Sequence, residues 1–227
     1  MSQKQKSSLP RLTPIEIPVM NQTRSNTVEL LGFYGDDETI ALSAWTSTSR
    51  ELTPEKQARI PKLLKDLATN GHETPFEKST LHFLVTTDIA SHIHLIKHRI
   101  GVSVNAESAR YRELLEDKFY VPGDWPEAEW NRLNEHCLRS FGMYHDALAR
   151  LTPVLGRKRA KESCRYYLPY ATQITSDVSY NLRSFIHFQL LRNDSHAQDE
   201  IHYIAAEMLR LTRETGKFNA SLEAFGY

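Results

Sequence analysis

The sequence predicts an α+β fold, in which a mostly antiparallel sheet is flanked by helices, including long helices in the C-terminal half. Two patterns carry this prediction. Short apolar or alternating segments, typical of strands, occur at 27–34, 81–86 and 172–178. Longer segments with apolar residues three or four positions apart, typical of helices, dominate after residue 125. With 227 residues, 40% of them hydrophobic, the chain is long enough for one globular domain.

In the first half of the chain, the segments are separated by turn residues such as Gly and Asn. Strands are expected at 27–34 and 81–86, and helical segments at 38–45, 53–70 and 89–98. Pro61 is expected to restart or kink the second helical segment. Asp88 is suited to cap the third, and Gly101 to break the chain after it. A further strand is expected at 110–115.

The second half is mainly helical. Helices are expected at 126–150, 157–167 and 180–192, with a strand at 172–178 between the last two. The sequence Ser195-His196-Ala197-Gln198 fits a capping box, so a final helix is expected to begin there and run to about Thr215.

Residues 1–25 are rich in Ser, Gln, Lys, Pro, Thr and Asn, and they predict a flexible N-terminal tail. A single domain is expected over 26–227. The chain has no 18-residue apolar run and no apolar core of a signal peptide, so a cytoplasmic protein without a membrane partner is expected. The two cysteines, Cys137 and Cys164, are then expected to be reduced.

The charge distribution favours a small anionic ligand. The formal net charge is zero, which argues against a nucleic-acid partner, because such proteins usually carry a basic excess. Basic residues instead gather at 97–112, 157–165 and 183–192.

The densest of these segments is 97–112, where apolar residues alternate with basic, amide and hydroxyl side chains. Guanidinium, amide and hydroxyl groups together suit phosphate and planar polar rings. The segment is therefore a candidate wall of an anionic-ligand site. The alternative is a salt-bridged helix end followed by an edge strand.

Two more segments are candidates. Arg183 and His187 share one helical face because they lie four residues apart, and Arg192 is roughly aligned with them. They either line an anionic groove or form an ordinary polar face. Arg192 also directly precedes residues 193–198, so that Arg, His and Gln side chains converge at this joint between helices. Helix capping and dipole effects nevertheless explain most of that segment.

Other kinds of site are disfavoured. His94 and His98 have a spacing that can bind zinc, but no HExxH glutamate accompanies them and Lys97 adds repulsion, so no metal is predicted. The GxSxG elbow of hydrolases is absent. The GxGxxG motif and the P-loop are also absent, so any nucleotide cofactor must be held by side chains.

Four signatures in order resemble the flavin-dependent thymidylate synthases over about 28–205. They are Gly71-His72-Glu73-Thr74-Pro75-Phe76, Lys97-His98-Arg99 followed by Ser103-Val104-Asn105-Ala106-Glu107-Ser108-Ala109-Arg110-Tyr111, Asn181-x-Arg183, and Arg192-Asn193-Asp194-Ser195-His196-Ala197-Gln198. The resemblance implies reductive methylation of dUMP at C5. Methylenetetrahydrofolate would supply the carbon, NADPH the electrons, and FAD would carry the hydride. It also implies a homotetramer with shared active sites.

The resemblance implies roles for individual residues. Arg192 matches the catalytic arginine that stabilises a uracil anion, and Ser108 is a binder rather than a nucleophile. The residues that match nucleotide contacts are His94, Lys97, Ala106, Glu107, Ser108, Ala109, Arg110, Arg165 and Arg192. Those that match FAD contacts are Ser47, His72, Thr74, Lys97, His98, Arg99, Glu107, Asn181, Arg183 and His187.

The chain departs from the family pattern at both pockets. Lys97 replaces an Arg, His94 stands where Gln is common, and His187 where Asn is common. Ala106 occupies the usual acidic position, and one extra residue lies between Arg99 and Ser103. The same chemistry on UMP or a related pyrimidine nucleotide is therefore an alternative. A flavin- or nucleotide-binding protein without catalysis is the alternative of another class.

Overall fold

A computed structural model describes residues 25–227 of the chain. The sheet in this region has four antiparallel strands in the order β1-β2-β4-β3. The strands are β1 (Thr27–Tyr34), β2 (Thr80–Asp88), β3 (Val102–Ala106) and β4 (Gln173–Asn181). The predicted antiparallel sheet is confirmed. The predicted tail lies outside the described residues, except for Ser25, and the single domain over 26–227 stays a prediction.

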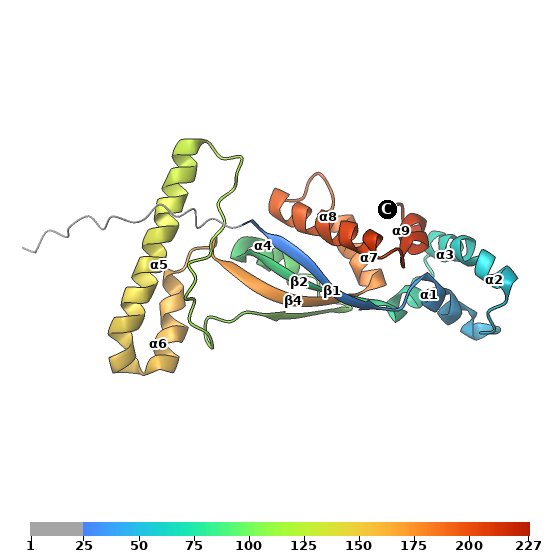
Figure 1. Ribbon diagram of the computed structural model, residues 1–227, viewed down its shortest axis with the longest axis horizontal. Helices are drawn as coiled ribbons and strands as arrows, with labels where there is room; N and C mark the ends of the chain where they lie inside the picture. Colours follow the sequence, from blue (N-terminus) through green and yellow to red (C-terminus); the bar gives the residue numbers. More distant parts are fainter. Residues whose placement is uncertain (1–24) are drawn as a thin grey trace, which may run out of the picture.

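The helices divide into three groups (Figure 1). At one end of the sheet lie α1 (Asp37–Ala44), α2 (Pro54–Ala58), α3 (Ile60–Thr69) and α9 (Asn219–Ala224). Beside the sheet lie α4 (Ile89–Leu95), α7 (Leu182–Arg192) and α8 (Asp199–Glu214). At the other end stands a hairpin of α5 (Glu127–Leu155) and α6 (Arg157–Cys164). Short 3₁₀ turns are η1 (Trp45–Ser47), η2 (Thr74–Lys78) and η3 (Arg165–Tyr167).

The main core lies between the sheet and the helices on one of its faces. Alternate β2 residues Leu81, Phe83 and Val85 are fully buried, as the period of two in a strand requires. Phe83 stacks on Phe185 of α7 with 5.9 Å between ring centroids. Each such buried side chain stabilises the fold by about 2 kcal/mol. This packing fixes α7 against the sheet.

A second core lies within the α5–α6 hairpin and the loop beside it. Its fully buried members include Phe119, Phe141 and Tyr144. Cys137 and Cys164 lie in the same cluster as free, buried thiols, which confirms the prediction of reduced cysteines. No helix within residues 25–227 is long and apolar enough to cross a membrane.

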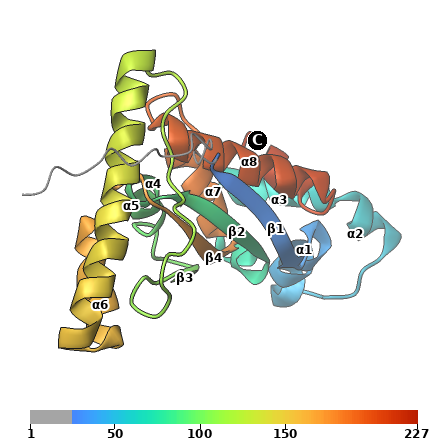
Figure 2. The same cartoon turned by 60° about the vertical axis from the view of Figure 1, so that its left-hand side comes forward.

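Two predictions made from the sequence are wrong. The predicted strand at 110–115 is a turn and loop, and the strand in this region is β3. Val102 and Val104 give β3 its half-buried alternation, whereas the chain after Ala106 runs as a loop beside the α5–α6 hairpin (Figure 2). In this loop Arg110 bonds to Glu162 of α6. The capping box at Ser195 is also wrong, because α8 begins only at Asp199. Asp194 instead accepts a hydrogen bond from the His196 backbone N–H, 2.9 Å away.

Several boundaries also differ from the predicted ones. The helix predicted at 89–98 ends at Leu95, and α5 continues to Leu155, beyond Pro153. The helix predicted at 157–167 divides into α6 and η3. Near Pro61 the helix restarts, because α3 begins at Ile60 and Pro61 lies in its first turn, where it removes no helical hydrogen bond.

Gly101 joins the start of β3 to the start of α7. Its carbonyl accepts a hydrogen bond of 2.9 Å from the Asn181 backbone N–H, and its φ is +63°. A Cβ at this position would lie 2.2 Å from Asn181 Nδ2 and 2.3 Å from Ser184 Oγ. The close approach therefore requires glycine for both its φ and its lack of a side chain.

We expect Gly101→Ala to lower the free energy of unfolding by at least about 3 kcal/mol, because backbone strain and overlap with α7 add. Gly71→Ala is the matched control, since Gly71 has a φ of +67° but no atom within 4 Å of its would-be Cβ. That variant is expected to lose only about 1 kcal/mol. Urea unfolding measures both, and equal losses would contradict the proposed overlap.

Candidate functional site

A cavity of about 750 Å³ lies where the chain after α4, the start of β3 and α7 meet. Seven of the residues predicted to bind ligands line it: Lys97, His98, Arg99, Asn181, Arg183, His187 and Arg192. The apolar part of its lining includes Ile100, Val102 and Leu191. The cavity thus combines cationic donors with apolar surface, as a site for a charged, planar ligand requires.

The sequence of α7 explains how one helix supplies most of this wall. Asn181 caps the helix, because its Oδ1 accepts a hydrogen bond of 2.8 Å from the Ser184 N–H. Phe185 and Phe188 turn one side of the helix into the core and are fully buried. Arg183 and His187, four residues apart, consequently line the cavity on the other side. The predicted shared face is confirmed, and that it binds an anion stays a prediction.

Two carboxylates hold Arg183. Its Nε donates to Glu73 at 2.7 Å and its Nη1 to Glu77 at 2.6 Å. These bonds, that to Glu77 first, raise the pKa of the Arg183 guanidinium. Both glutamates line the cavity, and sequence reasoning missed them as site residues. The sequence gives only a weak indication that these glutamates belong to the site. Glu73 lies inside the Gly71–Phe76 signature, and Glu77 follows four residues later, one helical turn on.

Arg192 is bonded to a histidine rather than to a carboxylate. Its Nε donates to His98 Nε2 across 3.0 Å. Arginine has no acceptor, so the His98 Nε2 must be unprotonated. Burial, then the charges of Arg192 and His187, lower the pKa of His98 from 6.5 to about 4. The geometry and the electrostatics therefore both require a neutral His98.

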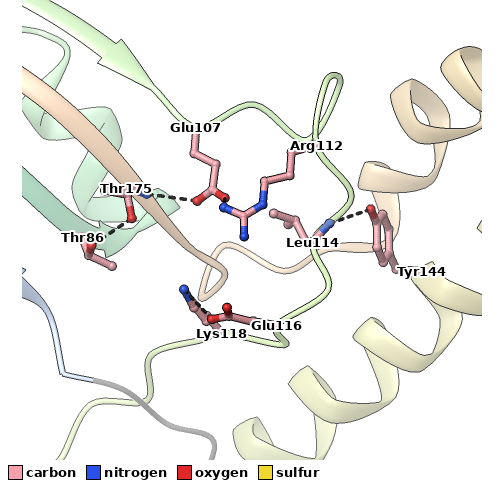
Figure 3. A network of polar contacts seen from close by, with 8 residues as sticks. All are labelled: Thr86, Glu107, Arg112, Leu114, Glu116, Lys118, Tyr144 and Thr175. Atoms are coloured by element: carbon pink, nitrogen blue, oxygen red, sulfur yellow. Dashed lines mark hydrogen bonds and ion pairs between the residues drawn. The ribbon is translucent and has the colours of Figure 1, made fainter.

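The nucleotide half of the predicted 97–112 wall lies apart from this cavity. Ala106 borders an adjacent hollow of about 380 Å³, which His98 and Arg99 also line. The Glu107 carboxylate accepts a hydrogen bond of 3.0 Å from Arg112 Nη1 and one of 3.4 Å from the Thr175 backbone N–H (Figure 3). This network fixes the course of the chain immediately after β3.

The hairpin holds the rest of this segment. Arg110 Nη2 lies 3.2 Å from the Glu162 carboxylate of α6, and Lys161 donates to the Tyr111 carbonyl at 2.7 Å. Ser108 and Ala109 lie in the turn between these contacts and β3. Arg165 opens η3, at the end of α6, and is exposed. These predicted nucleotide contacts therefore form a second group beside α6.

The remaining predicted residues lie in two other places. His94 is on α4, and burial, then the charges of Arg192 and Lys97, lower its pKa. Its Nδ1 is buried and has no hydrogen-bond partner among the described residues. The exposed predicted FAD contacts Ser47, His72 and Thr74 lie in or beside η1 and η2 and do not line the cavity. Among residues 25–227, no three potential metal ligands of the His, Cys, Asp or Glu type lie together.

Comparison with known proteins decides the family. A family model described as thymidylate synthase complementing protein matches residues 29–215. The chain belongs to the flavin-dependent thymidylate synthase family. A flavin-dependent thymidylate synthase of Pseudothermotoga lettingae is 37% identical over 186 residues, which cover 78% of this chain and 80% of that relative. One from Thermosipho melanesiensis is 32% identical, with 82% and 85% covered. This membership makes the chain an enzyme of that kind and confirms the predicted resemblance.

The fold is also that of a solved relative. The crystal structure of a UMP/dUMP methylase, PolB from Streptomyces cacaoi, bound with 5-Br dUMP, has a TM-score of 0.75 and 29% identity to this chain. The match covers 90% of this chain and 96% of PolB. A second structure of PolB, bound with 5-Br UMP, has a TM-score of 0.73 and 28% identity, with 90% and 95% covered.

We expect the stability of the protein to fall as pH falls below about 6.5. Folded His98 stays unprotonated down to about pH 4, whereas the unfolded chain binds its proton near 6.5, so the unfolded state gains protons first. His92 and His94, whose pKa values are also lowered, act in the same direction. Urea unfolding between pH 7.5 and 4.5 should show a shallower pH dependence in His98→Gln. The same slope in both proteins would contradict the lowered pKa of His98.

Proposed function

We propose that the protein catalyses the FAD-dependent reductive methylation of dUMP at C5, giving dTMP. Methylenetetrahydrofolate supplies the carbon and NADPH supplies the electrons. Membership of the flavin-dependent thymidylate synthase family supports the reaction class. The 5-Br dUMP bound to PolB supports the nucleotide class.

The single observation that carries the proposal is the placement of Arg192 in the cavity. Its Nε donates to His98, and among residues 25–227 its two Nη groups remain to donate to a ligand. In the proposed reaction they bond to N3 and O2 of the uracil, where negative charge develops. A fixed guanidinium in a partly buried site stabilises that charge and so makes C5 more nucleophilic. The protein needs no nucleophile of its own for this step.

The donor set of the cavity fits a flavin nucleotide. Lys97 and Arg99 suit the pyrophosphate, and Asn181 offers an amide to a polar ring edge. Ile100 and Leu191 supply apolar surface for a flat ring. FAD, when bound there, would supply the hydride that brings the transferred carbon to the methyl level. Arg183, held by two carboxylates, would then keep one face of the site in place.

The proposed assembly is a homotetramer with shared active sites. Ser47, His72 and Thr74 are exposed and lie outside the cavity, and Arg110 is exposed beside α6. In the proposed tetramer these residues complete the cavities of neighbouring copies. Large exposed aromatic residues such as Tyr166, 83% accessible in the single chain, support burial in an assembly.

UMP is the second candidate substrate. PolB, which matches nearly the whole chain, has been crystallised with both the dUMP and the UMP analogue. His94 and Ala106 differ from the family pattern at positions matched to nucleotide contacts, and Ala106 borders the hollow next to the main cavity. Such changes can alter the room available to a 2′-hydroxyl.

The deciding experiment is a product assay with dUMP and UMP side by side, in the presence of FAD, NADPH and methylenetetrahydrofolate. We expect methylated product from dUMP and less, or none, from UMP. A higher kcat/KM with UMP would assign the substrate to the ribonucleotide. No methylated product from either nucleotide would contradict the proposed function.

We expect Arg192→Ala to reduce kcat for methylation at least about hundredfold, because it removes the donor to the uracil anion. Bound flavin, measured from its visible absorbance, should remain. Arg132→Ala, at an exposed arginine on α5, is the control and should keep wild-type turnover. Substantial turnover by Arg192→Ala would show that another group stabilises the anion.

A further inference from the structure

We infer that His98 is a positioning residue for Arg192, acting as the acceptor that fixes the direction of the guanidinium. The inference rests on the proposed function of Arg192. It gives His98 a task separate from the FAD contact that the family resemblance implies.

The geometry leaves one arrangement of donor and acceptor. The Arg192 Nε and His98 Nε2 are 3.0 Å apart, and only the imidazole nitrogen can accept. Arg192 is the last residue of α7, so its long side chain extends from a helix end and would otherwise populate several rotamers. A bond at Nε fixes the plane of the guanidinium. Both Nη groups stay available to a ligand.

His98 is itself held in place. Its ring packs edge-on against Phe188 with 5.0 Å between centroids, and against His187 at 6.2 Å. Its backbone N–H donates to the Leu95 carbonyl at the end of α4. Phe188 is fully buried in the main core. The position of the acceptor is therefore defined by the core rather than by a mobile side chain.

The surrounding charges keep His98 able to accept. From α7, Arg192 and His187 act on it, and both lower its pKa, after burial. Lys97 and Arg99 flank it in the chain and add positive charge on the same wall. A proton on Nε2 would remove the acceptor and place two cations together.

The nearby titratable groups on other elements do not counteract the positive charges that keep His98 neutral. His94 on α4 has a lowered pKa, and Tyr180 on β4 has a raised one, so neither carries a charge near neutral pH. The cavity carboxylates Glu73 and Glu77 are bonded to Arg183. A neutral acceptor next to Arg192 leaves its positive charge undiminished, whereas a carboxylate would offset it. The site thereby orients the guanidinium without weakening its attraction for an anion.

The test compares His98→Gln with His98→Leu. The Gln side chain offers an oxygen near the position of Nε2 and is not protonated between pH 4 and pH 7, whereas Leu fills space without accepting. We expect His98→Gln to keep kcat within about threefold, and His98→Leu to lose at least about tenfold. Flavin content is measured in both variants and kcat is expressed per bound flavin, so that a loss of the FAD contact is separated from a loss of positioning. His136→Leu, at an exposed histidine of α5 outside the cavity, is the control.

A double-mutant cycle separates positioning from a general structural effect. Binding of dUMP to each holoenzyme, followed by the change in flavin absorbance, needs no turnover. If His98 acts through Arg192, the His98→Leu change should weaken binding in the wild type but add little in Arg192→Ala. In addition, any loss of kcat on acidification that arises from His98 should be absent in His98→Gln.

Three outcomes would overturn the inference: full kcat in His98→Leu, equal damage in His98→Gln and His98→Leu, or additive effects on dUMP binding. Failure of the proposed function is a separate result, since it appears as wild-type protein that makes no methylated nucleotide. The coupling between His98 and Arg192 in ligand binding would still be measured in that case.

Discussion

The site depends on one joint at Asn181, where β4 ends and α7 begins. This residue pairs with Thr80 in the sheet, caps α7 through the Ser184 N–H, and donates its own N–H to the Gly101 carbonyl. Strand β4, helix α7 and the turn before β3 therefore meet at the side chain and backbone of Asn181. The arginines of α7 face the cationic turn after α4 because this joint fixes the direction in which the helix leaves the sheet.

Charge is compensated differently at the two arginines of α7. Arg183 is bonded to two carboxylates, which makes it a fixed part of the wall. Arg192 is bonded to a neutral imidazole, and its positive charge remains available to an anionic ligand. Charges removed from water are usually paired or hydrogen-bonded, and the half-buried Arg192 has such a hydrogen bond. Within a single helix, carboxylates thus hold one guanidinium, while the other keeps an uncompensated positive charge at the cavity, as its proposed role requires.

Local sequence patterns predicted most of the fold, because strand alternation and helical spacing are decided by neighbours in the chain. They also predicted that Arg183 and His187 would share a face. They failed where distant residues decide: Arg110 pairs with Glu162, 52 positions away, and the expected strand is replaced by a turn held to α6. Glu73 and Glu77 could not be assigned to the site, since their partner lies more than 100 positions later. The predicted FAD contacts Ser47, His72 and Thr74 lie outside the cavity of the single chain, and their role stays a prediction.

The separate core of the α5–α6 hairpin has a consequence for how the molecule opens. Its buried residues form a cluster distinct from the one under the sheet. Parts of a protein that share few buried contacts can open as independent cooperative units. A subglobal opening of the hairpin would expose Cys137 and Cys164 to thiol reagents while the amides of β2 and β4 stayed protected from hydrogen exchange. The two thiols are thus natural reporters of local opening at one end of the molecule.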